Sequence, residues 1–155
     1  MIDELKNIEY VLFDLDGTVS DSSEGITKSA DKALKSEGID VPFETLTSFI
    51  GPALRVSFGR YTDDVEKRDR MLDVYRERYS EKGWCENKIY PGMAELLRDL
   101  QKSGKHVVLA SAKPEYFCRK IIKYFGVEQY FDFIGGSDME GKRDDKTVLL
   151  TYVLD

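Results

Sequence analysis

Tyr10-Val11-Leu12-Phe13-Asp14-Leu15-Asp16-Gly17-Thr18 is the stretch that decides the fold. Its first half is a short apolar run, which is typical of a buried strand in a parallel sheet. Two carboxylates, Asp14 and Asp16, then follow two residues apart, and Gly17 permits a sharp turn. Open α/β sheets bind ligands at the carboxyl ends of their strands, so we expect the two acids to lie at a ligand site.

Two neighbouring carboxylates are costly to place together unless a cation or a proton accompanies them. Mg²⁺ suits an all-oxygen site of this kind, because it keeps several waters and shares the oxygens of a substrate phosphate. One carboxylate would then act as nucleophile while the other transfers a proton. The alternative is that Asp16-Gly17 is only a tight turn after a strand. Asp14, which ends the apolar run two residues earlier, favours the site.

The run from Asp14 to Thr18 resembles the first signature of the haloacid dehalogenase superfamily of phosphohydrolases. This resemblance implies that Asp14 attacks phosphorus and forms an aspartyl-phosphate. Asp16 would protonate the leaving alcohol and then activate water. It also implies that Asp14 and Asp16 are ligands of Mg²⁺, and Thr18 offers a hydroxyl to the substrate.

Ser111 closes a second apolar run, residues 106–110, as Asp14 closes the first. In a parallel sheet both run ends face the same crevice, where the Ser111 hydroxyl and the Ala112 amide can donate hydrogen bonds to a phosphate. The alternative is that Ser111 caps the next helix. Beside the first signature, this serine resembles the second signature of the superfamily, and Lys113 is a further candidate for phosphate contact.

Lys146 precedes an apolar helix and resembles the third signature. A fixed cation is needed at such a site, because phosphoryl transfer gathers negative charge beside two carboxylates. The alternative is a solvated lysine on a helix face, and Lys142 and Arg143 are rivals for the role. The apolar pair Val148-Leu149 after Lys146 favours Lys146.

The predicted fold class is α/β: a Rossmann-like parallel sheet core interrupted by an all-helical insertion. Residues 1–18 and 87–155 alternate strand and helix patterns, which calls for a parallel sheet, whereas residues 19–86 carry four helical patterns in succession. The resemblance implies that residues 19–86 are a cap that closes over the site and selects the substrate. Arg55 and the nearby residues 49–52 are similar to a loop of phosphoglycolate-phosphatase-like members, although a surface salt bridge explains Arg55 equally well.

A fourth signature, a pair of acids after a fourth strand, is not found in the sequence. Asp138 follows the expected third strand, residues 130–134, and Asp155 comes nine residues after Lys146. We therefore expect the last strands to be absent, which leaves the first strand at an edge of the sheet. The chain is then either a truncated version of a longer phosphatase, with weak Mg²⁺ binding and slow turnover, or a divergent form.

Composition narrows the function further. The sequence of 155 residues has 41% hydrophobic and 34% charged residues, which is typical of a globular protein, and its net charge of −6 argues against nucleic-acid binding. No stretch approaches the ~20 apolar residues of a transmembrane helix, and the N-terminus does not have the pattern of a secretory signal. The two cysteines, Cys85 and Cys118, favour a reduced cytoplasmic setting.

The function expected from these observations is a Mg²⁺-dependent phosphatase that acts on a small phosphorylated metabolite. A phosphosugar mutase of the same superfamily is the first alternative, and a noncatalytic binding or regulatory module is the second. A haloacid dehalogenase itself is disfavoured, because that chemistry uses neither the second aspartate nor Mg²⁺.

Overall fold

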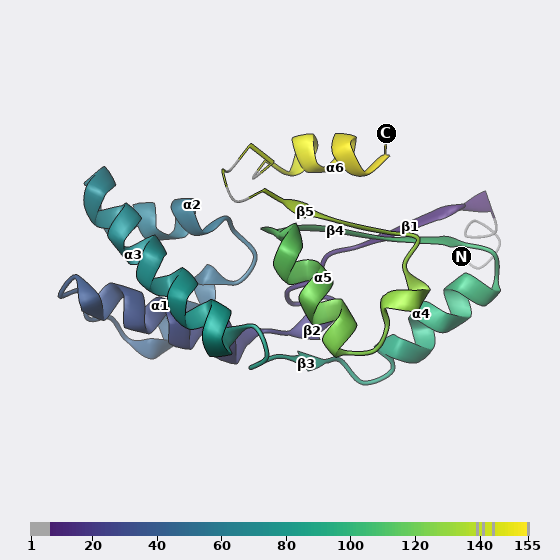
Figure 1. Ribbon diagram of the computed structural model, residues 1–155, viewed down its shortest axis with the longest axis horizontal. Helices are drawn as coiled ribbons and strands as arrows, with labels where there is room; N and C mark the ends of the chain where they lie inside the picture. The colour runs from purple at the N-terminus through teal and green to yellow at the C-terminus, as the bar shows by residue number, and fades with distance from the viewer. Residues whose placement is uncertain (1–6, 139, 141, 144, 155) are drawn as a thin grey trace. The chain divides into compact units, whose positions relative to one another are not determined.

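The computed structural model describes residues 7–138, 140, 142–143 and 145–154. The chain divides into two compact units, one formed by Met1–Val19 with Ile89–Asp155 and the other by Ser20–Lys88. We call them the sheet unit and the helical unit (Figure 1). Their boundaries lie within two residues of the insertion expected from the sequence.

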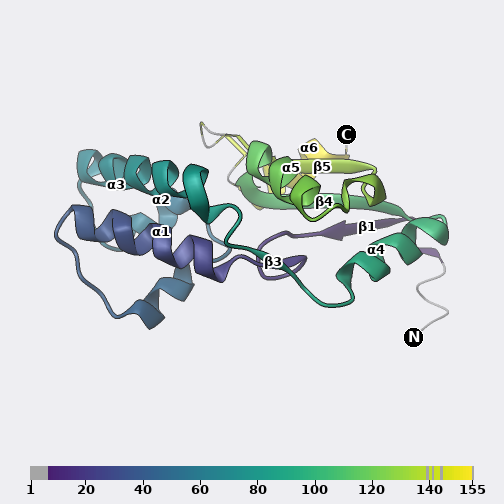
Figure 2. The same cartoon turned by 60° about the horizontal axis from the view of Figure 1, so that its bottom comes forward.

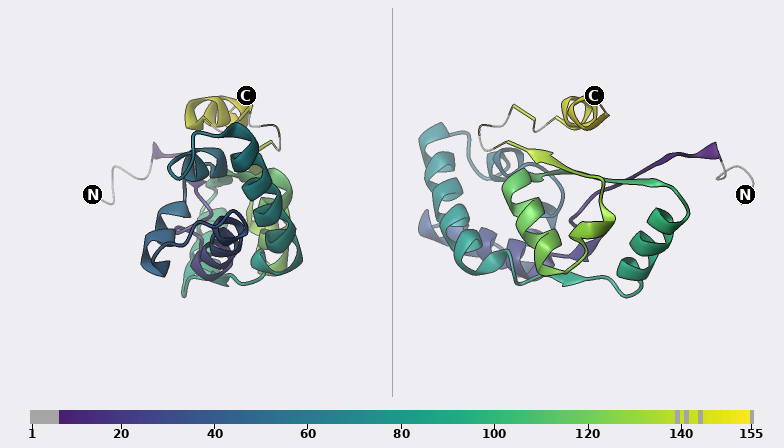
Figure 3. Two further views of the ribbon diagram at one scale, coloured as in Figure 1. Left: turned by 90° about the vertical axis from the view of Figure 1, so that its left-hand side faces the viewer. Right: turned by 45° about the vertical axis from the view of Figure 1, so that its right-hand side comes forward.

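The sheet unit is built on three parallel strands in the order β1-β4-β5, namely β1 (Tyr10–Phe13), β4 (His106–Pro114) and β5 (Phe133–Ser137). Its helices are α4 (Met93–Lys102), α5 (Glu115–Tyr124) and α6 (Lys146–Leu154), with a 3₁₀ turn at Glu128–Tyr130. Helices α4 and α5 cover one face of the sheet and α6 covers the other (Figures 1 and 3). This is the α/β architecture that the sequence predicted.

Burial explains which strand lies in the centre. The run Val107–Ala110 of β4 is buried throughout, because helices lie on both faces of this strand. In β1, by contrast, Tyr10 is exposed and the next three residues are only half-buried. Within the described residues β1 pairs only with β4, so β1 is an edge strand. This agrees with the edge position that the sequence analysis expected for the first strand.

The third strand begins later than the sequence suggested. Tyr130 belongs to the 3₁₀ turn and Phe133–Ser137 forms β5, so Gly135 and Gly136 lie within the strand instead of ending it. Gly136 is required there, because an added Cβ would lie 2.5 Å from the Cα atom of Glu115 and 2.6 Å from the carbonyl oxygen of Lys113. The glycine lets β5 approach the backbone where β4 passes into α5.

The helical unit contains α1 (Ser23–Ser36), α2 (Leu54–Gly59) and α3 (Val65–Arg78), a 3₁₀ helix at Phe43–Phe49 and a π-helical turn at Tyr79–Gly83. Helices α1 and α3 lie side by side (Figure 2). Apolar residues at helical spacing form the core of this unit: Ile26, Ala30, Ala33, Leu34, Leu46, Phe49, Phe58, Met71, Leu72, Tyr75 and Tyr79. The Asp64 carboxylate caps α3 by accepting the backbone N–H of Lys67 at 3.1 Å.

The sequence analysis found no strand within residues 19–86, yet a short one exists. Strand β2 (Ser20–Asp21) pairs with β3 (Lys88–Ile89), where the chain passes between the two units. Strands of two residues are too short to show an alternating pattern, which explains the omission. Among the residues that the structure describes, none of the helices combines the length and apolar character needed to span a bilayer.

Candidate active site

The register of the sheet brings the predicted site residues to one edge. Phe13, the last residue of β1, pairs with Leu109 of β4, so Asp14 and Ser111 lie just beyond this pair. Ser111 pairs with Gly136 of β5, and the register shifts between Ser111 and Pro114. Since all three strands are parallel, these residues share the carboxyl edge at which ligands bind in such sheets.

A tight turn after β1 turns the two carboxylates toward this edge. Asp14 Oδ1 accepts the backbone N–H of Leu15 at 2.8 Å, and Leu15 is fully buried. The carbonyl oxygen of Leu15 then accepts the N–H groups of Thr18 and Val19, and Gly17 adopts a φ of +78° that favours glycine. The turn therefore exists, as the alternative explanation of Asp16-Gly17 proposed, and it holds both acids at the edge.

Each carboxylate is paired with a lysine from another element. Lys146 Nζ, at the start of α6, lies 3.1 Å from Asp14 Oδ2, and Lys113 Nζ, near the end of β4, lies 2.8 Å from Asp16 Oδ2. The second pair is almost fully buried, with 7% of the Lys113 side chain and 10% of the Asp16 side chain exposed. The Asp14 side chain is 30% exposed, so it is the more accessible of the two acids.

Asp145 helps to place Lys146. Its carboxylate accepts the backbone N–H groups of Thr147 and Val148 at 2.8 and 3.2 Å, as a helix cap does, and these bonds lower the pKa of Asp145. The rival cations point elsewhere: Lys142 pairs with Glu140 at 2.6 Å, and the Arg143 guanidinium lies over the Tyr152 ring. Of these three cations, Lys146 is the one that the structure places against Asp14.

The predicted phosphate-binding residues lie around the two pairs. Ser111 is buried in β4 and its Oγ accepts the backbone N–H of Lys113 at 3.3 Å. Ala112 is half-buried in the irregular stretch of the same strand, and Thr18 is exposed on the turn after β1. Their contacts with a substrate stay predictions.

The donor set is suitable for Mg²⁺. Asp16 Oδ1 is buried and has no hydrogen-bond partner among the described residues, which leaves one carboxylate oxygen available. Within that part of the chain, no group of three or more Asp, Glu, His or Cys side chains is arranged to hold a metal ion. Two carboxylates are nevertheless enough for Mg²⁺ when waters and a substrate phosphate complete the octahedron. Asp14 and Asp16 would therefore hold it.

Arg55 lies in the helical unit. Its Nη1 atom is 3.0 Å from Asp69 Oδ1, and both side chains are exposed. The surface salt bridge considered in the sequence analysis is therefore present, and the contact of Arg55 with a substrate stays a prediction.

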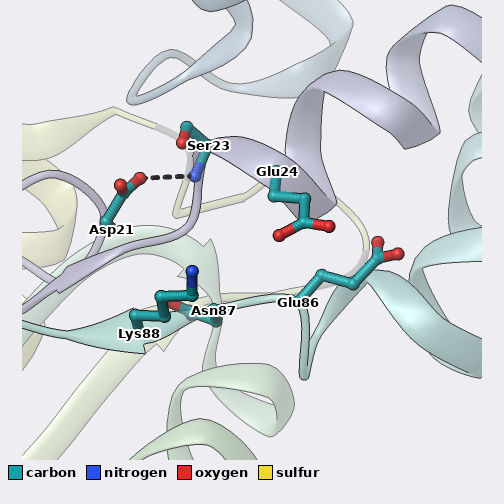
Figure 4. A pocket seen from close by; sticks show the side chains of 6 residues that line it. All are labelled: Asp21, Ser23, Glu24, Glu86, Asn87 and Lys88. Atoms are coloured by element: carbon teal, nitrogen blue, oxygen red, sulfur yellow. Dashed lines mark hydrogen bonds between the residues drawn. The ribbon is translucent and has the colours of Figure 1, made fainter.

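The helical unit also has a small pocket of about 190 Å³, lined by Asp21, Ser23, Glu24, Glu86, Asn87 and Lys88 (Figure 4). Its acids already have partners. Asp21 accepts hydrogen bonds from Ser23, which lower the pKa of Asp21, and Arg78 lowers the pKa of Glu86 through an ion pair at 2.8 Å. Glu24 pairs with Lys28 at 2.6 Å. We assign no ligand to this pocket.

The sequence analysis missed the partner of Lys113, which it treated as a contact of the phosphate. No local pattern couples Lys113 with Asp16, because 97 positions separate them in the sequence and only the β1–β4 pairing brings them together. Cys118 is a packing residue, since it is fully buried and burial raises the pKa of its thiol.

Comparisons with known proteins agree with this arrangement. Residues 11–153 match the family model of haloacid dehalogenase-like hydrolases. A 5'-nucleotidase of Pseudomonas aeruginosa is 40% identical over 94% of this chain and 66% of its own length. The tyrosine-protein kinase PtkA of Mycobacterium tuberculosis is 36% identical over 94% of this chain and 50% of its own length.

A phosphoglycolate phosphatase of Aquifex aeolicus is 31% identical over 88% of this chain and 64% of its own length. The crystal structure of a predicted phosphatase from Clostridium acetobutylicum superimposes with a TM-score of 0.91 at 42% identity, covering 95% of this chain and 69% of that chain. The chain thus spans between half and two thirds of the length of these curated relatives.

The family match extends over both units and includes the turn with Asp14 and Asp16, Ser111 and Lys146. On this match, and on the likeness to the Clostridium structure, the chain belongs to the family of haloacid dehalogenase-like hydrolases.

Proposed function

We propose that this chain carries the phosphoryl-transfer site of a Mg²⁺-dependent phosphomonoester hydrolase. The observation that carries the proposal is the double pairing at the carboxyl edge of the sheet, Asp14 with Lys146 and Asp16 with Lys113. Two carboxylates with separate cations can take separate roles, because each has its own electrostatic environment. Their different exposure supports the same division of roles.

In the proposed reaction, a carboxylate oxygen of Asp14 attacks the phosphorus of the substrate and the bond to the leaving oxygen breaks. Asp16 donates a proton to that oxygen, and the alcohol departs. Asp16 then takes a proton from a water molecule, which attacks the aspartyl-phosphate and releases inorganic phosphate and free Asp14. Asp16 gives one proton to the departing alcohol and takes another from water, so its protonated form is restored after one cycle.

The cations of the chain offset the charge that this reaction gathers. The Lys146 ammonium lies 3.1 Å from Asp14 Oδ2. It can therefore stabilise the negative charge that develops on the equatorial phosphate oxygens when Asp14 attacks. Ser111 and the Ala112 amide are proposed to bind the remaining oxygens. Mg²⁺ held by Asp14 and Asp16 would supply Lewis-acid neutralisation of the phosphate charge.

A small phosphomonoester is the proposed substrate class. Relatives named 5'-nucleotidase and phosphoglycolate phosphatase support it, while the name of PtkA shows that similar chains carry other activities as well. We infer no single compound from these names. Nucleoside 5'-monophosphates and phosphoglycolate are the first two substrates to compare, because the two relatives carry their names.

Phosphate release from an aryl phosphate, measured over a Mg²⁺ titration, tests the proposal. Release should rise with Mg²⁺, and Asp14→Asn should reduce it to the uncatalysed rate, because the nucleophile is lost. Asp99→Asn is the control, since Asp99 is an exposed acid that pairs with Arg98. Equal rates for wild type and Asp14→Asn would refute the assignment.

Trapping with beryllium fluoride separates hydrolysis from the noncatalytic alternative. A Mg²⁺-dependent adduct at Asp14 is expected for a phosphoryl-transfer site, whereas a binding module would form none. Free phosphate separates a hydrolase from a mutase, because a mutase returns the phosphoryl group to a sugar.

A further inference from the structure

We propose that Glu115 is a positioning residue that acts through helix α6 to hold Lys146 at Asp14. The inference rests on the proposed function, because it gives Glu115 a role in the same site without contact with the substrate. It concerns a carboxylate that the mechanism does not use and that the sequence analysis did not single out.

Glu115 is the point at which three elements meet. Its Oε2 atom accepts a hydrogen bond from the Tyr152 hydroxyl of α6 at 3.1 Å. Its Oε1 atom accepts from Arg119 Nε and Nη2 at 3.0 and 2.9 Å, and Arg119 Nη2 also donates to the carbonyl oxygen of Ile134 in β5 at 2.9 Å. The Glu115 side chain therefore connects α5 with α6 directly, and with β5 through Arg119.

The backbone of Glu115 is itself fixed. Gly136 of β5 packs so closely on the Glu115 N and Cα atoms that a Cβ on the glycine would lie 2.5 to 2.6 Å from them. Glu115 also follows by two residues the Lys113 that pairs with Asp16. A hydrogen bond from α6 to Glu115 thus connects the helix that begins at Lys146 to the junction of β4 and α5, two residues from the other lysine.

Helix α6 depends on such a connection because it buries few side chains of its own against the sheet. Leu149 is its single buried residue among those described, while 46% of Val148 and 61% of Leu154 are exposed. Lys146 is the first residue of the helix, and its side chain is 60% exposed. A shift of α6 would therefore move the ammonium group away from Asp14 without a large loss of core packing.

Tyr152 is held at Glu115 by two further contacts. Its ring lies 5.8 Å from the Phe133 ring in an edge-to-face arrangement, and the Arg143 guanidinium lies 4.0 Å from its centroid. Both contacts involve the ring and not the hydroxyl. Tyr152→Phe therefore removes the hydrogen bond to Glu115 and leaves the packing of the ring in place.

The first test measures kcat of Tyr152→Phe and Glu115→Ala with an aryl phosphate. We expect kcat to fall about 10-fold in each, because small displacements of a catalytic group are costly. Tyr116→Phe controls for loss of a tyrosine hydroxyl, since Tyr116 contacts Phe117 and Lys120 through its ring. Glu95→Ala controls for loss of an acid in the first turn of a helix.

A double-mutant cycle separates positioning from general stability. Lys146→Met should lower kcat by about 10²-fold or more. In that background Tyr152→Phe should change kcat less than about 2-fold, because there is no ammonium left to misplace. Equal losses from Tyr152→Phe in the two backgrounds, or no loss in the wild type, would overturn the inference.

Acetylation of Lys146, followed by mass spectrometry, tests the inference even if the chain proves inactive. In Tyr152→Phe the ion pair between Lys146 and Asp14 should weaken, so the acetylation rate of Lys146 should rise about 2-fold or more. The acetylation rate of Lys102 serves as the internal reference. An unchanged rate would overturn the positioning role by itself. If the wild-type protein is inactive and the acetylation rate of Lys146 still increases in Tyr152→Phe, the proposed function is overturned and the positioning of Lys146 through Glu115 and Tyr152 is retained.

Discussion

The buried Lys113–Asp16 pair gives the sharpest prediction for the sheet unit. Lys113→Met keeps most of the length and apolar volume of the side chain and removes the ammonium group. The Asp16 carboxylate, 10% exposed, is then left without its cation. Its Oδ1 atom has no hydrogen-bond partner among the described residues, so in Mg²⁺-free buffer these residues do not compensate for the loss.

The expected cost follows from the geometry. At 2.8 Å, and with an effective dielectric constant of about 20, the attraction between the two charges is about 6 kcal/mol before desolvation. Breaking a buried pair by removing one partner typically costs about 3–5 kcal/mol, which is a large part of the stability of an ordinary domain. With an m-value of about 2 kcal/mol/M, the urea midpoint should fall by about 1.5–2.5 M.

Urea unfolding followed by circular dichroism measures this shift. The fluorescence of the single tryptophan, Trp84, reports on the helical unit, because this residue lies there. Hydrogen exchange of the amides in β4 is therefore needed to assign the shift to the sheet unit. Lys123→Met, at the exposed end of α5, should change the free energy of unfolding by less than about 0.5 kcal/mol.

The double variant Lys113→Met with Asp16→Asn makes the reasoning testable in both directions. It should regain most of the lost stability, because no unpaired charge remains buried. Asp16→Asn alone should cost less than Lys113→Met, since a long lysine side chain can reach toward water. A loss below about 1 kcal/mol in Lys113→Met, or no recovery in the double variant, would refute the view that the pair is electrostatically coupled.

Three further predictions concern single contacts. Gly136→Ala should destabilise the sheet unit by about 1–3 kcal/mol, seen as a lower urea midpoint, because its Cβ would meet the backbone of Glu115. Asp64→Ala should lower the stability of the helical unit by about 1 kcal/mol through loss of the α3 cap, measured by thermal unfolding. The pKa of Glu86 is lowered from 4.5 by Arg78, so its contribution to stability is complete above pH 4.5 and is lost as the pH falls below it. Glu86→Gln should therefore be less stable than wild type at pH 7, and the difference in melting temperature should shrink toward pH 3.

The first and the third of these predictions each have a clear contrary outcome. Gly59→Ala is the matched control for Gly136→Ala, because a Cβ at Gly59 would meet only the Arg68 guanidinium at 3.8 Å, so a similar loss in both would reject the steric argument. A constant difference between wild type and Glu86→Gln across the pH range would reject the linkage argument.

Local pattern was sufficient for most helices and for placing the two acids directly after the first strand. The glycines that follow α1, α4 and α5 are visible in the sequence as helix-ending residues, and they adopt positive φ angles, 73° at Gly38, 76° at Gly104 and 69° at Gly126. The apolar run ending in two acids was placed correctly at the carboxyl end of a strand. The errors came where pattern is weak: the two-residue strands β2 and β3, and the start of β5, which the aromatic residues before Phe133 obscured.

The sequence by itself determined the α/β class, the helical insertion and the acids at the end of the first strand, because strand and helix periodicity and turn residues act over a few positions. Only the tertiary structure decided which lysine meets which acid, Lys113 with Asp16 and Lys146 with Asp14, and that Glu115 connects α5 with α6. Lysine and glutamate side chains are long and can satisfy many partners. Their pairing follows from strand register and helix packing between distant segments, which no local pattern contains.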